Sequence, residues 1–375
     1  MSDAIYINAD EIVSPLGLGS DQNFERLLDG DTAIAPMMDA SLLDHPVHVA
    51  RIADESWQHL IHDAAQYTRL ERLFILAMQR LIDNHDIPLD NGTLVVISTT
   101  KGNISLLGDP PSNFPADRVN ITSLASTIGR YFGLSHQPIP ISNACISGAL
   151  AISVARRLLQ YDERYQRAVV VGGDELSKFI LSGFESFQAL AAEPCRPFDR
   201  DRKGVNLGEA IAAVYLTREP SAGAVKIMGV GSFNDANHIS GPSRTGEGLY
   251  LSIQEALREA GGIMPDFISA HGTATIYNDE MEAIAFHRSG LSGVPLHSLK
   301  GYYGHTLGGS GLLETVIAIQ SLKSGTLIPS AGFKHSGTTQ PVNIITEPLT
   351  RPLRTFLKTA SGFGGCNIAT MIQKV

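Results

Sequence analysis

Short runs of β-branched residues alternate with longer helical segments along this chain, and that alternation restricts its fold more than any other feature. The strand candidates are residues 94–98 (LVVIS), 168–171 (AVVV), 211–216 (IAAVYL), 225–230 (VKIMGV), 267–270 (FISA) and 367–372 (NIATMI). Runs of this length and composition are typical of buried strands. The helix candidates are residues 68–82, 149–159 and 311–322. The pattern predicts an α/β protein with helices packed over or between mixed sheets.

The surroundings of Cys145 and His305 resemble each other. Each stretch passes from a strand end or loop, through one reactive residue and several small residues, into a long apolar helix. This similarity indicates two pseudo-symmetric halves that share one core. We expect residues 1–222 to carry the cysteine and residues 223–375 to carry two histidines, in one compact catalytic unit.

Composition excludes several functional classes. The 375 residues have a net charge of −9, with 43% hydrophobic and 18% charged residues, which is typical of a globular protein. A negative overall field disfavours nucleic acids and anionic lipids as partners. No run approaches the roughly 18 apolar residues of a membrane span, and the first residues lack a leader pattern, so we expect a cytoplasmic protein. Cys145, Cys195 and Cys366 are too few for a disulfide framework and should be thiols.

Cys145 lies in a setting that favours a reactive thiol. The segment 143–148 (NACISG) follows the strand-like PIPIS and precedes the helix at 149–159. Its small residues suit a tight strand-to-helix turn. Because a helix N-terminus or a nearby imidazole lowers the pKa of a thiol, Cys145 is a candidate nucleophile. The alternative is a buried cysteine that acts as a small hydrophobic residue.

Two histidines occupy glycine-rich turns farther along the chain. His271 lies in AHGTAT after the strand at 267–270, and His305 lies in KGYYGHT. A single histidine at a strand end usually makes structural hydrogen bonds. Two such histidines, together with a cysteine at a strand-to-helix turn, predict a nucleophilic active site.

The order of these motifs resembles the β-ketoacyl-acyl-carrier-protein synthases, the decarboxylating condensing enzymes of fatty-acid and polyketide synthesis. The matching motifs are Cys145, HGTAT at 271–275 followed by Asn278-Asp279, KGYYGHT at 300–306, GFGG at 362–365, VSPLG at 13–17, RPFD at 196–199, Gly208-Glu209 and Glu314. A Cys-His-His triad is specific, since thiolases use a second cysteine and chain-initiating synthases carry asparagine in place of one histidine. The resemblance spans nearly the whole chain and implies a thiolase-type fold with two pseudo-symmetric halves and layered mixed sheets and helices.

The resemblance also implies roles for individual residues. Cys145 would hold an acyl group as a thioester, while His271 and His305 would donate hydrogen bonds to the malonyl thioester oxygen and stabilise the enolate left by loss of CO2. The backbone N–H groups of Cys145 and Phe363 would form the oxyanion hole. Lys300 and Glu314 would support the triad, and an ordinary surface ion pair is the alternative. Phe363 would gate the acyl pocket, and a core aromatic residue is the alternative.

The implied activity is decarboxylative Claisen condensation of a malonyl-carrier thioester with the acyl group on Cys145. It implies acyl carrier protein as a partner, substrates carried on phosphopantetheine, no further cofactor or metal, and a homodimer or a heterodimer with a ketosynthase-like subunit. The rival interpretation is a non-catalytic chain-length-factor subunit. Because such subunits usually lack the nucleophile, the presence of Cys145 favours the enzyme.

Several departures from the family pattern affect the substrate. The chain is shorter than most members, mainly between residue 98 and Cys145, so the shape of the acyl pocket stays open. Trimmed members of this kind resemble the synthases of aryl-polyene and flexirubin-type pigment pathways. Length, saturation and aromaticity of the acyl chain are not encoded by any motif.

Other sequence signals are weaker. His45, His48, His59 and His62 form two HxxH pairs, but no cysteine or acidic cluster completes a metal site. The GxG segments at 229–231 and 362–364 lack the third glycine of a dinucleotide fingerprint. Cys195 and Cys366 are expected to serve packing.

An acidic carrier needs a local basic surface on a chain of negative net charge. The densest basic positions are Arg69 and Arg72 at the start of the helix at 68–82, and Arg200, Arg202 and Lys203 after RPFD. They predict a docking surface, and ordinary solvated charges are the alternative.

Overall fold

One mixed sheet of 12 strands runs through the computed structural model, which describes residues 4–61, 64–108, 113–235 and 241–375. The strand order is β14-β12-β11-β16-β17-β10-β1-β9-β7-β5-β6, with β2 paired to β1. These strands are β1 (Ile5–Ser14), β2 (Gly17–Leu18), β5 (Thr93–Ser98), β6 (Ile139–Ile141), β7 (Arg167–Asp174), β9 (Ala210–Thr217), β10 (Val225–Asn234), β11 (Phe267–Ser269), β12 (Pro295–His297), β14 (Asn343–Ile344), β16 (Thr355–Gly362) and β17 (Cys366–Lys374). Two small sheets join β3 (Ala35–Met37), β4 (Val47–Ala50) and β8 (Leu207–Gly208), and β13 (Thr326–Leu327) with β15 (Leu349–Thr350).

The large sheet repeats one pattern on both sides of its middle, where β1 pairs with β10. Moving outward from β1, the chain adds β9 and β7 antiparallel and then β5 and β6 parallel. Moving outward from β10, it adds β17 and β16 antiparallel and then β11 and β12 parallel. This repeat confirms the predicted α/β architecture with two pseudo-symmetric halves.

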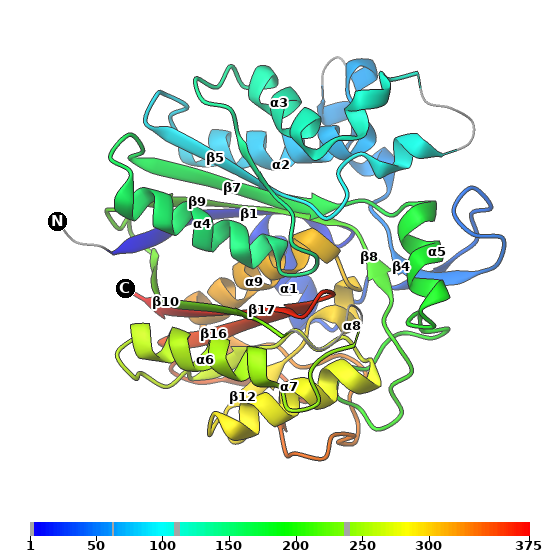
Figure 1. Cartoon of the computed structure of the whole chain (residues 1–375), viewed down its shortest axis with the longest axis vertical. Coiled ribbons are helices and arrows are strands. Elements are labelled where there is room, and N and C mark those ends of the chain that lie inside the picture. Colours follow the sequence, from blue (N-terminus) through cyan, green and yellow to red (C-terminus); the bar gives the residue numbers. More distant parts are fainter. Residues whose placement is uncertain (1–3, 62–63, 109–112, 236–240) are drawn as a thin grey trace.

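Helices fill the space between the two arms of the sheet and cover both outer faces (Figure 1). The helices are α1 (Ser20–Leu28), α2 (Arg69–His85), α3 (Ile121–Tyr131), α4 (Ser147–Tyr161), α5 (Lys178–Ser186), α6 (Glu247–Glu259), α7 (Ile276–Arg288), α8 (Lys300–Tyr303) and α9 (Ser310–Ser324). Helices α4, α9 and α1 lie in the middle layer, α2 and α3 on one outer face, and α6 and α7 on the other. The result is a layered arrangement in which α4 and α9 have sheet on either side.

Helices α4 and α9 begin in close backbone contact. A Cβ atom at Gly148 would lie 2.8 Å from the backbone nitrogen of Leu312, and one at Gly311 would lie 2.8 Å from the backbone nitrogen of Ala149. Real Cβ atoms do not pack this tightly, so the contact requires glycine at both positions. Because Cys145 and His305 lie just before these helices, the contact brings the two turns together.

All six predicted strands and all three predicted helices are present, each within a few residues of the expected bounds. Strands β1 and β16, both central in the sheet, were not predicted from the sequence. Neither were helices α1, α3, α5, α6, α7 and α8. Across the described residues, no helix is both long enough and apolar enough to span a membrane.

Candidate active site

Cys145 lies in the turn between β6 and α4, as the sequence predicted. The preceding Ala144 has a φ of 44°, in the left-handed region that residues with a side chain rarely adopt. Ser147 closes the turn, since its hydroxyl accepts a hydrogen bond from the N–H of Asn143 (2.8 Å) and donates one to the carbonyl of Ala144 (2.6 Å). Gly362 packs on this turn: a Cβ there would lie 3.0 Å from the Cys145 nitrogen. The turn therefore holds the thiol in one position.

The Cys145 thiol is protonated in the free protein. Burial, with a smaller contribution from the nearby Cys366 thiol, raises its pKa to about 12, although Lys300, the N–H of Phe363 and Lys101 act in the opposite direction. The expectation that the helix N-terminus lowers this pKa is therefore wrong, because desolvation of the thiolate outweighs the favourable charges. The thiol needs a proton acceptor when it attacks a substrate.

His271 follows β11 in a turn that carboxylates from α7 hold in place. Glu282 accepts hydrogen bonds from the N–H groups of His271 (2.9 Å) and Gly272 (2.6 Å), and Asp279 accepts one from Thr273 (2.9 Å). Gly272 has a φ of 37°, and a Cβ there would lie 2.5 Å from that of Ser298. These contacts explain why the HGTAT turn contains glycine and why acidic residues follow it.

His305 is held by the chain segment around β8 and by a buried aspartate. Its N–H donates to the carbonyl of Asn206 (2.7 Å), and its carbonyl accepts from the N–H of Gly208 (3.0 Å). Asp174, at the end of β7, accepts a hydrogen bond from the N–H of Gly308 (2.7 Å) just after this turn. The two halves of the protein therefore meet directly behind His305.

The structure brings Cys145, His271 and His305 together from 126 and 34 positions apart in the sequence. The Cys145 sulfur and one ring nitrogen from each histidine lie within 4.8 Å of one another. The two imidazoles meet edge to face, with centroids 5.2 Å apart and planes at 83°. All three side chains are buried.

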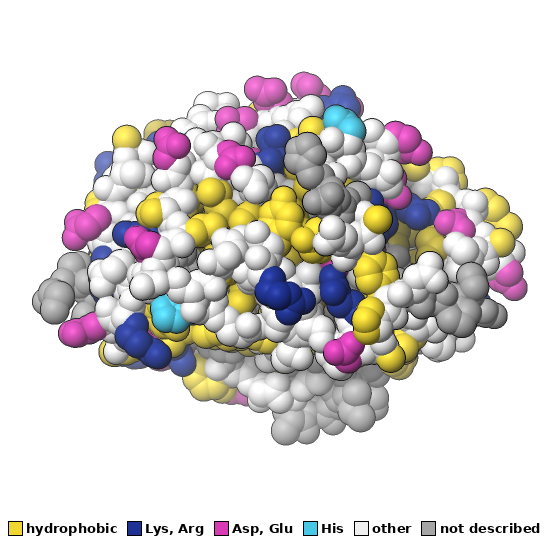
Figure 2. All heavy atoms as spheres, turned by 90° about the horizontal axis from the view of Figure 1, so that it is seen from above, with side chains coloured by type: hydrophobic (Ala, Val, Ile, Leu, Met, Phe, Trp, Pro, Cys, Tyr) yellow, Lys and Arg dark blue, Asp and Glu magenta, His cyan; other side chains and the backbone are white. Residues whose placement is uncertain are grey.

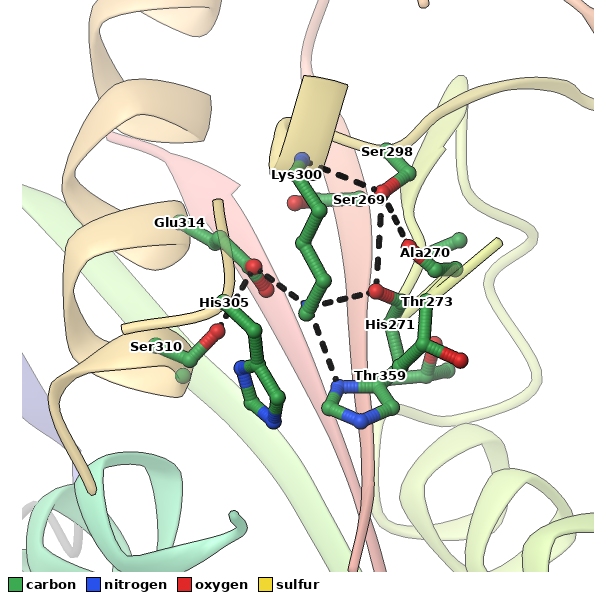
Figure 3. Close-up of polar contacts among 12 residues, drawn as sticks. Ser269, Ala270, His271, Thr273, Ser298, Lys300, His305, Ser310, Glu314 and Thr359 are labelled. Carbon is green, nitrogen blue, oxygen red and sulfur yellow. Dashed lines mark hydrogen bonds and ion pairs between the residues drawn. The ribbon is translucent and has the colours of Figure 1, made fainter. Parts of the chain in front are cut away.

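Lys300 and Glu314 form a buried ion pair beside His271 (Figure 3). The Lys300 ammonium lies 2.8 Å from Glu314 Oε1 and also donates to the His271 carbonyl (2.5 Å) and reaches His271 Nδ1 (3.2 Å). Ser310 donates to the same carboxylate oxygen, and Lys358 binds the other one. Burial opposes ionisation of Glu314, but the two ammonium groups hold its pKa down at about 2. An ordinary surface ion pair is therefore the wrong interpretation.

Both histidines present an N–H group to the space beside the Cys145 sulfur. His271 Nδ1 accepts from the Lys300 ammonium, and His305 Nδ1 accepts from the N–H of Leu307 (3.3 Å), which assigns the single ring proton of each to Nε2. Burial and the charge of Lys300 lower the pKa of both imidazoles well below 6.5, so both are neutral at neutral pH. The arrangement can stabilise an oxyanion.

The same three side chains have the elements of a metal site, but their surroundings do not suit a cation. A histidine that binds a metal usually donates its other N–H to a carbonyl or carboxylate. Here the Nδ1 atoms of His271 and His305 face donors, so the Nε2 atoms carry hydrogen rather than a free lone pair. The site fits a ligand that accepts two hydrogen bonds.

The HxxH histidines form no comparable cluster within the described part of the chain. His45 contacts Asp44 and Glu185, each at 2.9 Å. His62 lies outside the described residues. The structure therefore adds nothing to the weak metal signal of this segment.

Phe363 lies at the rim of the site. Its N–H approaches the Cys145 sulfur, where an oxyanion hole would need it, and the residue is 37% exposed. The ring stacks on Phe184 (5.6 Å between centroids) and meets Phe187 edge to face (5.5 Å). A core aromatic residue is therefore the wrong interpretation of Phe363. Phe184 and Phe187 were not predicted as neighbours of Phe363, because no motif in the segment around α5 marks them.

The other two cysteines are buried, as expected. Cys195 donates to the carbonyl of Lys300 (3.2 Å), and Cys366 lies near the carbonyls of Phe363 and Asn143. Burial raises the pKa of each thiol to about 11. Both thiols are protonated at neutral pH.

The predicted basic docking surface is wrong for Arg69 and Arg202. The Arg69 guanidinium binds the carboxylates of Glu209 and Asp54 inside the protein. Arg202 is buried and donates to backbone carbonyls, including that of Gly337 (2.8 Å). These arginines pair with acidic or carbonyl groups that the sequence places far away.

The three remaining basic positions differ in exposure. The Arg72 guanidinium lies over the ring of Trp57, 5.4 Å from its centroid, and the residue is half-buried. Arg200 and Lys203 are exposed. From the predicted set, only the loop after RPFD thus offers exposed basic side chains.

Comparisons with known proteins agree with this geometry. Family models described as the N-terminal and C-terminal domains of β-ketoacyl synthase match residues 2–222 and 224–334. The 3-oxoacyl-acyl-carrier-protein synthase 2 of Rhizobium meliloti is 26% identical over 99% of this chain and 98% of its own length, and the protein of that name from Coxiella burnetii gives the same values. A solved complex of the ketosynthase ApeO with its chain length factor ApeC, from Xenorhabdus doucetiae, is 25% identical with a TM-score of 0.87, covering 99% of this chain and 98% of that one. The ishigamide ketosynthase/chain length factor is 22% identical with a TM-score of 0.89, and the match covers 99% of both chains.

Proposed function

The chain belongs to the β-ketoacyl synthase family of condensing enzymes, and on this basis we propose that it joins a malonyl-carrier thioester to an acyl group held on Cys145, with loss of CO2. Its fold is the thiolase-type fold that the sequence predicted. The observation that supports the proposal most strongly is the pair of Nε2–H donors beside the Cys145 sulfur.

The first half-reaction is acyl transfer. The Cys145 sulfur attacks the thioester carbon of an acyl carrier, and the thiol proton that the high pKa leaves in place passes to the pantetheine sulfur, since both Nε2 atoms already carry hydrogen. The carbonyl oxygen gains charge against the N–H groups of Cys145 and Phe363. The bond to the pantetheine sulfur then breaks, and the proton leaves with that thiol.

The second half-reaction is decarboxylative condensation. The malonyl thioester oxygen accepts hydrogen bonds from His271 and His305, which stabilise the enolate as the carbon–carboxylate bond breaks and CO2 leaves. The enolate carbon attacks the acyl carbon on Cys145, and the sulfur departs as a thiolate that takes a proton from water. A neutral imidazole suits this step, because it donates a hydrogen bond without transferring its proton.

We propose acyl carrier protein and a second ketosynthase-like subunit as the partners. The names of the relatives and of the solved complexes support this assignment. The outer face formed by α3 and its neighbours shows hydrophobic side chains gathered across its middle (Figure 2), which is typical of a protein contact. The short strand β6 lies at the edge of the large sheet, and its residues are half-buried. We propose that it forms part of the contact with the second subunit.

The same proposal covers organisation and location. Residues 1–222 and 223–375 form two halves of one catalytic unit, because Cys145 comes from one half and both histidines from the other. Free thiols at all three cysteines support a reducing compartment such as the cytoplasm. The acyl and malonyl groups arrive on phosphopantetheine, and the reaction needs no further cofactor. The products serve fatty-acid or type II polyketide synthesis, including the aryl-polyene type.

The test separates the two half-reactions. We expect Cys145→Ala to abolish condensation in a folded protein, and His305→Ala to retain acyl transfer while malonyl decarboxylation falls by about 100- to 1000-fold, the effect of losing one oxyanion donor. Intact-mass analysis with a panel of acyl carriers, including aryl-polyenoyl chains, measures acyl transfer, and CO2 release measures decarboxylation. Acylation of the Cys145→Ala protein would contradict the assignment.

A non-catalytic chain-length-factor subunit is the rival function, since two similar solved structures contain such a subunit. The intact cluster of Cys145, His271 and His305 disfavours it. A mechanism-based inhibitor of condensing enzymes should label Cys145 in preference to Cys195 and Cys366. Equal or absent labelling would support the rival.

A further inference from the structure

A second buried lysine shares the carboxylate of Glu314. Lys358 lies on β16, its side chain is 0% exposed, and its ammonium lies 2.5 Å from Glu314 Oε2, while Lys300 holds Oε1. The Lys358 ammonium also donates to the carbonyls of Ser269 (3.1 Å), Ala270 (3.4 Å) and Thr359 (2.6 Å). Two of these carbonyls belong to the peptide groups that lead into His271.

We propose that Lys358 is a positioning residue for His271, which fixes the end of β11 and frees Lys300 to bind the His271 ring. The inference rests on the proposed function, because it assigns His271 the role of an oxyanion donor. Lys358 itself does not touch the reacting atoms. It acts through the backbone before His271 and through Glu314.

The backbone contact follows from the register of the sheet. Strand β11 has only three residues, and its partner β16 places Lys358 opposite Ser269. So short a strand has few ladder hydrogen bonds to fix its end, and the side chain of His271 begins two residues later. The Lys358 ammonium binds both intervening carbonyls, so it restrains the turn that sets the direction of the imidazole.

The charge balance supports the same role. The ammonium groups of Lys300 and Lys358 flank the single carboxylate of Glu314, so each of its oxygens has a separate cationic partner. With Oε2 occupied by Lys358, the Lys300 ammonium keeps hydrogens for the His271 carbonyl and Nδ1. This holds the ring proton of His271 on Nε2, toward the substrate. The titratable groups facing His271 are Lys300 on α8, Glu314 on α9, Lys358 on β16, Glu282 on α7, and the side chains of His305 and Cys145.

The test compares two replacements of Lys358. Lys358→Met removes both the charge and the hydrogen bonds, whereas Lys358→Gln removes the charge and keeps an amide donor. We expect Lys358→Met to lower malonyl decarboxylation by about 10- to 100-fold, the typical cost of a misplaced group, while acyl transfer to Cys145 changes by less than about threefold. Lys323→Met is the matched control, because Lys323 pairs with Asp10 away from the site.

A purely structural role makes a different pattern. In that case Lys358→Met would lower the rates of both half-reactions equally, or would lower only the midpoint of thermal unfolding. Either result overturns the proposal. Loss of the positive charge should also raise the pKa of His271, so the acidic limb of decarboxylation should move to higher pH in both variants. If Lys358→Met does not fold, the test rests on Lys358→Gln. Wild-type rates of both half-reactions in that variant, together with an unshifted acidic limb of decarboxylation, would reject the positioning role of Lys358.

A second readout is independent of catalysis. The ¹⁵N shifts of histidine-labelled protein report which ring nitrogen carries the proton. We expect Nε2 protonation of His271 in the wild type and a mixture of tautomers in Lys358→Gln. An unchanged tautomer with unchanged rates overturns the inference, whereas a wild-type protein without condensing activity would contradict the proposed function instead.

Discussion

At the scale of single residues, the site depends on hydrogen-bond donors that no motif displays. Leu307 has a φ of 51°, and this unusual backbone aims its N–H at Nδ1 of His305. The sequence shows which histidine is present but not which of its nitrogens faces the substrate. The choice comes from the turn, and the turn depends on Asp174 from the other half of the chain.

The state of the Cys145 thiol leads to a pH dependence that can be measured. With a pKa of about 12, the thiolate fraction rises about tenfold for each pH unit below that value. We therefore expect alkylation of Cys145 by iodoacetamide to accelerate about tenfold per pH unit from pH 6 to 9, without a plateau. Intact-mass analysis against time measures it, with Cys145→Ala as the control. A plateau near neutral pH would show that the thiol is already ionised in the free protein.

The three residues of the triad were predictable from the sequence. The residues that hold them in place were predictable only in part. Cys145, His271 and His305 stand in turns whose glycines mark them, and Lys300 and Glu314 follow from the resemblance to condensing enzymes. Lys358 was missed, because a lysine inside a strand usually faces solvent and only the fold shows that this one is buried. Arg69 was misassigned for the converse reason, since its carboxylate partner Glu209 is 140 positions away.

At the scale of secondary structure, the helix pair α4 and α9 determines where the site forms. We expect Gly311→Ala to destabilise the protein by about 1–3 kcal/mol, because its Cβ would lie 2.8 Å from the backbone nitrogen of Ala149, which cannot move aside. Helix propensity alone predicts the opposite sign, because replacing glycine with alanine inside a helix stabilises a protein by roughly 1 kcal/mol. Urea unfolding of the wild type and of Gly311→Ala measures the sign of the change in the free energy of unfolding.

Gly183 provides the matched control for this substitution. It lies within α5, and a Cβ there would meet nothing within 4 Å. Gly183→Ala should therefore be neutral or stabilising, by up to about 1 kcal/mol. If Gly311→Ala behaved in the same way, close packing of α4 on α9 would not be what joins the two turns.

Elements with simple apolar patterns were predictable, and elements with internal polar residues were not. Strand β1 contains Asp10 and Glu11, which break the hydrophobic run in sequence. In the structure Asp10 binds Gln320 and Lys323 at α9, and Glu11 binds Arg80 at α2. These partners make the polar residues compatible with a central strand, and they become apparent only when the helices are in place.

At the scale of the whole molecule, the proposed function requires this acidic chain to bind an acidic carrier. The loop after RPFD lies against the turn that carries His271, since the N–H of Gly204 donates to the carbonyl of Ala274 (3.0 Å). Arg200 and Lys203 lie four residues and one residue before Gly204, and both side chains are exposed. Their exposure makes them the docking candidates in place of Arg69 and Arg202, whose guanidinium groups bind acidic or carbonyl groups inside the protein.

We expect the double change Arg200→Glu with Lys203→Glu to raise the apparent KM for carrier-bound substrate about tenfold at low salt and to weaken its salt dependence. Long-range charge attraction governs the encounter with an acidic partner and is screened by salt. Activity with a small pantetheine thioester should not change, since such a substrate has no acidic surface. Steady-state kinetics at several salt concentrations measure both substrates.

Arg258→Glu is the control for net charge, because Arg258 is exposed and its ion pair with Glu255 lies on α6. It adds negative charge to the same molecule away from the loop after RPFD. If this variant raised the KM for the carrier as much as the double change did, the total field of the protein would control the encounter. If the double change reduced activity equally on both substrates, Arg200 and Lys203 would support the turn that carries His271 and would not receive the carrier.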